Sequence, residues 1–398
     1  MKLIQDKLDV KNKTRVNLFN WRGQFTPDFV DYILESFAHP DDIFVEPFSG
    51  SGTVLLECAR RDLSCYGFEI SPAAYAMSKF FTFTNVSQEI RLDIASSLKE
   101  KILSLIQKFH ALPLFSEHES FREGYKNLLE FSKVLFSKID SPQERILALN
   151  TLFIAENYKK GDLDSSVMKS FNYINKNLIH LPFTRKVVSA ELGDARLIHK
   201  NCPAKANIIF TSPPYINVFN YHQNYRAILE TLGWNMLKVA QSEFGSNRKN
   251  RGNRFRTVVQ YCLDMEQTLK SFWECLDKDG LIILVIGRES NVRKIPFYNG
   301  EMVKEIAKET GGFKDISNFE RTFINKFGIN LKEDIVTLRK DSAPPSFLKA
   351  KEIALKHLES ALSLASQEVK EDLLDAISGI DTVHPSPLFT TKGVFSNA

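Results

Sequence analysis

A short apolar run that stops at two prolines is the feature that most restricts how this chain can fold. Ala206–Phe210 is followed by Thr211, Ser212, Pro213, Pro214 and Tyr215. Because proline cannot donate to a sheet ladder and fixes its own φ, the run predicts a buried strand ending in a rigid, exposed corner. The corner offers carbonyls, a hydroxyl and a ring, which suit a planar group bearing an NH2, such as a nucleobase amine. An ordinary strand end is the alternative for a Pro-Pro pair alone.

A strand, a glycine turn and a helical pattern follow one another earlier, over residues 42–61. Gly50 and Gly52 allow the backbone to approach a ligand closely, as in the first β–α turn of nucleotide-binding sheets. The turn lacks the third glycine of the dinucleotide fingerprint, which argues against NAD. The next strand ends in Glu69, an acid placed to accept both hydroxyls of a ribose. These features fit an adenosine-containing ligand without a pyrophosphate, such as S-adenosylmethionine.

The two stretches together resemble the amino-group DNA methyltransferases, in particular their Ser-Pro-Pro-Tyr branch. The resemblance rests on the stretch Glu46-Pro47-Phe48-Ser49-Gly50-Ser51-Gly52-Thr53 and on Ser212-Pro213-Pro214-Tyr215. It implies that the first motif holds S-adenosylmethionine and that the second holds the target amine, with Ser212, Pro213, Pro214 and Tyr215 as the catalytic residues. A serine at position 212, in place of Asp or Asn, is typical of the cytosine-N4 branch.

The resemblance implies two further cofactor contacts. An aromatic segment before a helix contributes Gln24, Phe25 and Thr26 beside the methionine end, and Asp194 at the tip of the third strand accepts the adenine amino group. A plain capped helix starting at Thr26–Pro27 and a simple turn at Asp194 are the alternatives. The expected cofactor set is completed by Glu46, Pro47, Phe48, Gly50, Gly52, Thr53 and Glu69.

The expected fold is α/β, a doubly wound seven-stranded Rossmann-like methyltransferase sheet with a helical insertion. The apolar run Leu281–Gly287 predicts a central strand buried on both faces. Residues 1–86 and 183–341 are expected to form the methyltransferase domain, with the cofactor and catalytic motifs respectively. Residues 87–182 are expected to be a helical insertion, and 342–398 a helical extension. The polar, proline-containing end predicts disorder or a bound partner.

Composition sets limits on the class of protein. The chain has 398 residues, 43% hydrophobic and 25% charged, as in soluble globular proteins, and no apolar run of membrane-spanning length. Five cysteines without metal-type spacing predict a reducing compartment, the bacterial cytoplasm or nucleoid, and no metal. The net charge of +4 is mild, but a loop near residue 250 is basic. Its cations predict contact with DNA, a solvated surface loop being the alternative: Arg248, Lys249, Arg251, Arg254 and Arg256.

The segment after the corner is rich in aromatic and amide side chains, from Ile216 to Arg226. Such a segment can line a pocket for a flipped base by stacking, or it can begin the next helix. His222 within it is expected to be solvated or to cap a helix.

The chemistry implied is methyl transfer from S-adenosylmethionine to the exocyclic amine of a flipped base, most simply cytosine N4 in a specific duplex sequence. Ser212 and the Pro213 carbonyl would accept the amine hydrogens while Tyr215 stacks on the base. The alternatives are adenine N6, an RNA or protein-amide substrate, or a non-catalytic DNA-binding subunit. Double-stranded DNA is the expected partner, and a restriction endonuclease acting on the same site is a candidate. The residues indicate no oligomeric state.

Overall fold

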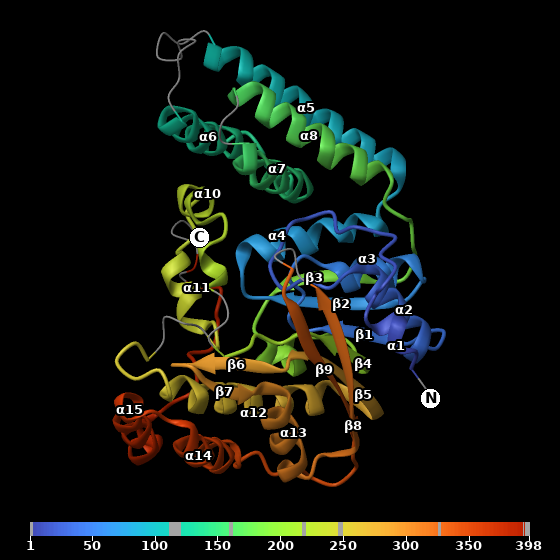
Figure 1. Ribbon diagram of the computed structural model, residues 1–398. Coiled ribbons are helices and arrows are strands. Elements are labelled where there is room, and N and C mark those ends of the chain that lie inside the picture. The colour runs from blue at the N-terminus through green and yellow to red at the C-terminus, as the bar shows by residue number, and fades with distance from the viewer. Residues whose placement is uncertain are drawn as a thin grey trace.

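A seven-stranded sheet forms the centre of the computed structural model, which describes residues 3–110, 121–158, 162–216, 220–245, 250–324, 328–392 and 394. The strand order is β3-β2-β1-β4-β5-β9-β8 (Figure 1). β9 lies antiparallel between β5 and β8, whereas β1 to β5 are parallel. The strands are β1 (Ile43–Glu46), β2 (Ser64–Glu69), β3 (Val188–Leu192), β4 (Ala206–Thr211), β5 (Leu276–Gly287), β8 (Phe313–Ile324) and β9 (Asn330–Lys340). The predicted α/β sheet is confirmed.

The order of the strands reverses at β1, which pairs with β2 on one side and with β4 on the other. In open α/β sheets, ligands bind outside the carboxyl ends of the strands at this point of reversal. β1 ends at Glu46, β2 at Glu69 and β4 at Thr211. The two motifs identified in the sequence therefore meet at one edge of the sheet.

Successive strand residues enter two separate cores, one on each face of the sheet. Phe44 and Ile283 belong to one core, while their neighbours Val45 and Ile282 belong to the other. The first core takes in α2 (Pro27–Phe37), α3 (Thr53–Arg60) and α4 (Pro72–Phe80), and the second takes in α12 (Arg256–Cys275), α13 (Asn299–Thr310) and α14 (Ala350–Ala361). The apolar run of β5 is buried on both faces, as predicted.

Between α4 and β3 the described residues form four α-helices, which lie together in Figure 1. They are α5 (Gln88–His110), α6 (Phe121–Phe136), α7 (Pro142–Ala155) and α8 (Leu163–Ile179). The buried guanidinium of Arg91 joins the two ends of this stretch, because it donates to the carbonyls of Val86, Leu181 and Pro182. The helical content of residues 87–182 is thus as expected, and its treatment as a separate lobe remains a prediction.

The shorter elements fill the periphery of the molecule. They are the helices α1 (Gln5–Leu8), α9 (Ile198–Asn201), α10 (Arg226–Thr231), α11 (Met236–Ser242) and α15 (Gln367–Ser378), and the hairpin of β6 (Glu289–Val292) with β7 (Ile295–Tyr298). The described part of the polar end differs from the expectation of disorder, since Phe389 and Val394 are buried in the first core; residues 393 and 395–398 lie outside the described residues. None of the described helices combines the length and apolarity needed to cross a bilayer.

Candidate functional site

A cavity open to solvent lies at the carboxyl ends of β1, β2 and β4. The side chains and backbone that line it are Trp21, Arg22, Gly23, Gln24, Phe25, Glu46, Phe48, Ser49, Gly50, Ser51, Thr53, Glu69, Ile70, Ser71, Ser212, Pro214, Tyr221, Glu243 and Phe244. Nine predicted site residues are among them, from both motifs. The described predicted residues outside the lining are Thr26, Pro47, Gly52, Asp194, Pro213, Tyr215, Arg251, Arg254 and Arg256.

The glycine turn uses its two glycines differently. Both have left-handed backbones, with φ of +51° at Gly50 and +83° at Gly52. Gly50 lines the cavity, and its N–H donates to Glu69 Oε2 at 2.9 Å. A Cβ on Gly52 would instead lie 2.7 Å from Phe81 Cδ2 and 2.8 Å from Ser78 Cα. Gly50 therefore faces the ligand space, whereas Gly52 allows the turn to pack closely against α4.

Glu69 is the most clearly placed acid of the cavity. Its Oε2 accepts the Gly50 N–H and its Oε1 accepts the Ser71 N–H at 2.8 Å. Burial raises the pKa of Glu69 to about 7, against the opposing effect of these backbone N–H groups. Each carboxylate oxygen has a second lone pair. The residue can therefore accept two further hydrogens from a ligand while the turn holds it in place.

Glu46 places a buried carboxyl oxygen against the cavity without a protein partner. The residue is 3% exposed, and within the described chain its Oε2 has no hydrogen-bond donor. Burial, together with neighbouring Cys65 and Glu69, raises the pKa of Glu46 well above its usual value. An unsatisfied buried acceptor is costly, so a ligand that brings a cation or an N–H would stabilise it. With Glu69 and Glu243 also in the lining, the cavity is chemically suited to a cationic ligand that carries hydroxyls.

The segment before α2 closes one wall of the cavity. Gln24 is fixed on both sides, since its Nε2 donates to the Phe19 carbonyl at 2.9 Å and its Oε1 accepts the Ser51 hydroxyl at 2.5 Å. The Phe25 ring stacks on Phe210 of β4 with centroids 5.2 Å apart. Thr26 stands at the N-cap position before Pro27, but its hydroxyl makes no capping bond and points into the protein unpaired. Gln24 and Phe25 thus reach the cavity, and Thr26 does not.

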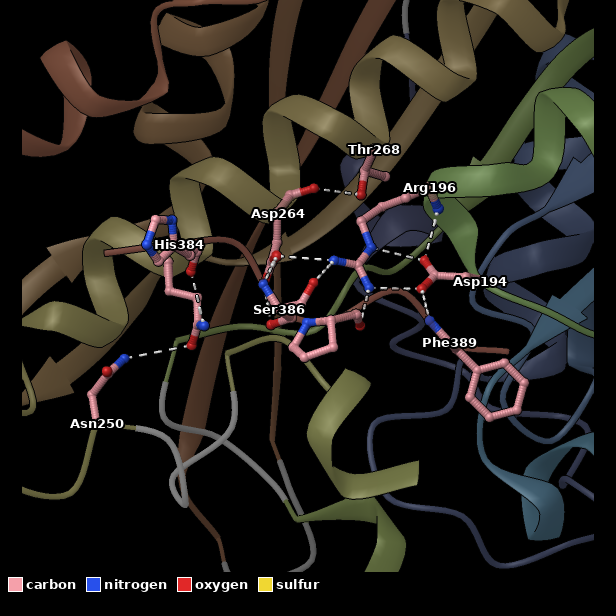
Figure 2. A network of polar contacts seen from close by, with 10 residues as sticks. Asp194, Arg196, Asn250, Asp264, Thr268, His384, Ser386 and Phe389 are labelled. Atoms are coloured by element: carbon pink, nitrogen blue, oxygen red, sulfur yellow. Dashed lines mark hydrogen bonds and ion pairs between the residues drawn. The ribbon is translucent and has the colours of Figure 1, made fainter. Parts of the chain in front are cut away.

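Asp194 lies two residues beyond the end of β3, and its carboxylate is bound within the protein (Figure 2). Its Oδ1 accepts from the backbone N and the Nε of Arg196, at 3.0 and 2.9 Å. Its Oδ2 accepts from Arg196 Nη2 at 2.7 Å and from the Phe389 N–H at 2.8 Å. The residue is 2% exposed and lies outside the cavity lining. In this conformation the expected adenine contact is not available, because arginine and the end of the chain use the acceptor positions.

The end of the chain is held in the same network. Arg196 Nη1 donates to the Ser386 carbonyl at 2.6 Å and forms an ion pair with Asp264 of α12 at 3.1 Å. Ser386 in turn donates its hydroxyl to Asp264 Oδ2 at 2.6 Å and its N–H to Oδ1 at 2.7 Å. Figure 2 shows these residues converging from β3, α12 and the segment after α15. The segment after α15, for which disorder was expected, therefore connects α12 to the residues that follow β3.

Only part of the Ser-Pro-Pro-Tyr corner lines the cavity. Ser212 and Pro214 line it, and the buried Pro213 lies between them. The Tyr215 ring lies against Gly287, where a Cβ would come within 2.6 Å of its Cε2. Its hydroxyl points to Ser212 Oγ at 3.1 Å and to Glu333 Oε1 at 3.4 Å. The tyrosine therefore contacts the serine through its hydroxyl and is not itself among the residues that line the cavity.

The predicted basic loop is only partly visible, because Arg248 and Lys249 lie outside the described residues. Arg256 forms an ion pair with Asp375 of α15, between Nη2 and Oδ2, at 3.1 Å. Arg251 is exposed and close enough to Arg254 to contribute, with burial, to lowering the pKa of that guanidinium. These cations do not line the cavity, and their contact with DNA remains a prediction.

Several cavity residues carry no motif signal. The Trp21 and Tyr221 rings stack at 5.8 Å with planes 17° apart, and Phe244 packs on Phe48. Glu243 accepts from the backbone N of His222 at 2.7 Å and pairs with its Nδ1 at 2.7 Å. The expectation that His222 is solvated is wrong, because the residue is buried and paired with Glu243. These partners come from distant parts of the chain, so only the aromatic richness of 216–226 hinted at them.

Two comparisons match this chain to known sequences. A family model described as DNA methylase matches residues 3–80. The Type II methyltransferase M.MjaII of Methanocaldococcus jannaschii is 28% identical over 170 residues, covering 39% of this chain and 32% of that protein. The chain thus matches about a third of the length of this curated relative.

Some solved structures are similar to this chain at low identity. TrmN from Thermus thermophilus is 13% identical, with 80% of this chain and 50% of that chain covered and a TM-score of 0.32. A SAM-dependent methyltransferase from Methanosarcina mazei is 9% identical, with 77% and 96% covered and a TM-score of 0.33. The fold assignment above accordingly rests on the strand order and directions.

Proposed function

We propose that this protein methylates DNA with S-adenosylmethionine as its cofactor, and the match of residues 3–80 to the DNA methylase family model supports this proposal. The proposed product is N4-methylcytosine, formed on a flipped base in duplex DNA. One observation carries the proposal. Ser212 and Pro214 of the corner share a single cavity with Gly50 and Glu69 of the glycine-turn side. Acceptors for a substrate amine and a site for an adenosine ligand thus face the same space.

The cofactor would be held by the residues on the β1 and β2 side. We assign Glu69 to the ribose hydroxyls, since both its oxygens keep an unused lone pair. Glu46 would accept from a cationic or N–H group, which its unpaired Oε2 lacks among the described residues. Gln24, Phe25, Phe48, Gly50 and Thr53 would complete the walls. When bound, the cofactor supplies an electrophilic methyl group.

The corner would act on the amine. A cytosine amine is a poor nucleophile, because its lone pair is delocalised into the ring. Hydrogen bonds from its two hydrogens to the Ser212 hydroxyl and the Pro213 carbonyl would favour a pyramidal nitrogen as positive charge develops. Both acceptors belong to the short rigid segment after β4, so they are held in place before the substrate arrives.

Duplex DNA hides the amine within the base stack. The base must therefore leave the stack, at a cost of a few kcal/mol that contacts in the pocket offset. The stacked Trp21 and Tyr221 rings at the cavity wall offer an apolar surface for this purpose. The basic residues Arg251, Arg254 and Arg256, with Arg248 and Lys249, are proposed to contact DNA phosphates. By analogy with the relative named as a Type II methyltransferase, the enzyme would protect a site from a cognate endonuclease.

The test is incubation with unmethylated duplex DNA and S-adenosylmethionine, followed by mass spectrometry of the nucleosides. We expect N4-methylcytosine, and a loss of at least about 100-fold in rate for Ser212→Ala, as when a positioned transition-state hydrogen bond is removed. The matched control is Ser363→Ala, an exposed hydroxyl remote from the cavity. N6-methyladenine would keep the reaction class and overturn the assignment of cytosine. No methylated deoxynucleoside from a protein that binds the cofactor would move the substrate to RNA or protein.

A further inference from the structure

Polar side chains connect the corner to the far edge of the sheet. Ser212 Oγ lies 3.1 Å from Tyr215 Oη, and that hydroxyl lies 3.4 Å from Glu333 Oε1. The second oxygen of Glu333, Oε2, forms an ion pair with Arg321 Nε at 2.9 Å, although the two atoms do not have hydrogen-bond geometry. The chain of contacts thus runs from the cavity wall through β9 to β8, which are joined along their length.

The members of this chain are held rigidly. The Arg321 guanidinium is 3.9 Å from the centre of the Phe29 ring and the residue is 5% exposed. The Tyr215 ring lies so close to Gly287 that a Cβ there would come within 2.6 Å. Neither ring nor guanidinium can swing away without disturbing the core. The tyrosine hydroxyl is therefore fixed between Ser212 and Glu333.

The directions of the hydrogen bonds follow from the donor and acceptor inventory. A carboxylate paired with a guanidinium only accepts, and a guanidinium only donates. The single hydrogen of the tyrosine hydroxyl is consequently given to Glu333. The contact between Tyr215 and Ser212 then has only one hydrogen left, that of the serine. Ser212 donates to Tyr215, and its lone pairs remain for the cavity.

We propose that Glu333 and Arg321 are positioning residues which, through the Tyr215 hydroxyl, fix Ser212 as a hydrogen-bond acceptor toward the substrate. This inference rests on the proposed methyl transfer to an amine. A free serine hydroxyl could equally donate to a ring nitrogen of the base. A serine already committed to Tyr215 selects a group that donates, which is the exocyclic amine. In this arrangement Tyr215 contributes through its hydroxyl, in addition to or instead of the stacking expected from its motif.

The test is a double-mutant cycle with Tyr215→Phe and Glu333→Gln. Each single variant is expected to lower kcat about tenfold, with KM for DNA and Kd for the cofactor unchanged, because orientation of one acceptor is lost. The double variant is expected to be no slower than either single variant, since both changes break the same chain. Matched controls are Tyr298→Phe on β7 and Glu320→Gln on β8, both exposed, which should keep wild-type kcat. Additive losses, or single variants with wild-type kcat, would overturn the proposal.

A second readout does not depend on activity. With tyrosine labelled at 13Cζ, the resonance absent from Tyr215→Phe identifies Tyr215. Burial and the Glu333 charge raise the pKa of Tyr215 well above its usual value, while the bond from Ser212 lowers it. We expect the resonance to move in opposite directions in Glu333→Gln and Ser212→Ala, and to stay in Glu320→Gln. An unmoved resonance would overturn the chain of contacts even if the protein methylates nothing. If the resonance shifts as expected but the protein methylates no amine, only the proposed function is overturned.

Discussion

Glu69 stands at the end of β2 and Asp194 just beyond the end of the neighbouring strand β3, and both were predicted to bind the cofactor. Glu69 lines the cavity and keeps acceptor capacity beyond the two backbone N–H groups that hold it. Asp194 is enclosed by Arg196 and by the Phe389 N–H, outside the cavity (Figure 2). The sequence correctly predicted an acid near the end of each strand, but the hydrogen-bond partners of the two carboxylates differ.

The difference lies in where the partners come from. The N–H groups that hold Glu69 belong to Gly50 and Ser71, at the adjacent strand end and the next turn. The network around Asp194 needs Ser386 and Phe389, which reach β3 from the end of the chain. A local motif therefore predicts a ligand-binding carboxylate only when hydrogen-bond donors from distant segments do not already occupy its oxygens.

The sharpest test of this comparison is Asp194→Asn. An amide at this position must turn an NH2 toward the donors of Arg196 or Phe389, so buried donors lose their partner. We expect the free energy of unfolding to fall by about 3–5 kcal/mol, as when a buried ion pair loses one partner. Urea unfolding followed by circular dichroism measures it. Cofactor Kd in the folded protein should change less than threefold.

The control for this variant is Glu191→Gln on the same strand, whose side chain is 57% exposed. Its stability should remain within about 0.5 kcal/mol of the wild type. If Asp194→Asn left stability unchanged and weakened cofactor binding instead, Asp194 would be a ligand after all, and the contrast with Glu69 would disappear.

The end of the chain can be loosened separately with Ser386→Ala. This change removes the 2.6 Å hydrogen bond from the Ser386 hydroxyl to Asp264, while Arg196 stays paired. Loss of a hydrogen bond to a charged group predicts a decrease in the free energy of unfolding of about 1.5–3 kcal/mol. Thermal unfolding against Ser363→Ala measures the difference. A neutral result would mean that the end of the chain is not bound in solution, which would also release Asp194.

Glu69→Gln tests the other half of the comparison. The amide keeps the shape but replaces one acceptor oxygen by a donor, so a ligand hydroxyl meets an NH2. We expect the Kd for S-adenosylmethionine to rise about 10–100-fold, equivalent to the loss of one or two hydrogen bonds. Isothermal titration calorimetry with Glu191→Gln as control gives the value. An unchanged Kd would exclude Glu69 from the cofactor site.

The sequence predicted those features that depend on a few consecutive residues. Three features follow from the conformational preferences of a few neighbouring residues. They are the turn at Gly50, the corner at Pro213–Pro214 and the apolar run of β5. Together with the resemblance to amino-group DNA methyltransferases, they led to the expected sheet and to nine of the residues that line the cavity. The same signals could not separate the roles of Gly50 and Gly52, because close packing of Gly52 depends on where α4 lies.

What the sequence did not predict depends on contacts between distant segments. Glu243 reaches the cavity wall through its pair with His222, and Tyr215 turns to Glu333, which lies 118 residues further on. The network at Asp194 includes the bond from Arg196 to Ser386, which lies 190 residues further on. Such pairs give no periodic pattern or fixed spacing in the sequence. From the sequence alone, either partner could equally well face solvent.

The smallest expected effect is the pH dependence that Glu69 introduces. Because folding raises the pKa of Glu69 from 4.5 to about 7, the folded protein binds this proton more tightly than the unfolded chain. Its contribution to stability is therefore fully present below about pH 4.5 and is lost as pH rises toward about 7. Cofactor affinity should change the opposite way, since the ionised carboxylate is the better acceptor of ribose hydroxyls.

Between pH 6 and pH 8 the ionised fraction of a group with a pKa of about 7 rises roughly tenfold, so the Kd for S-adenosylmethionine should fall by up to about tenfold. Calorimetric titration at both pH values measures it. In Glu69→Gln the Kd should be flat over this range, whereas Asp194→Asn should keep the wild-type dependence. A wild-type pH dependence that persists in Glu69→Gln would assign the titrating group to another acid of the cavity, with Glu46 or Glu243 in its place.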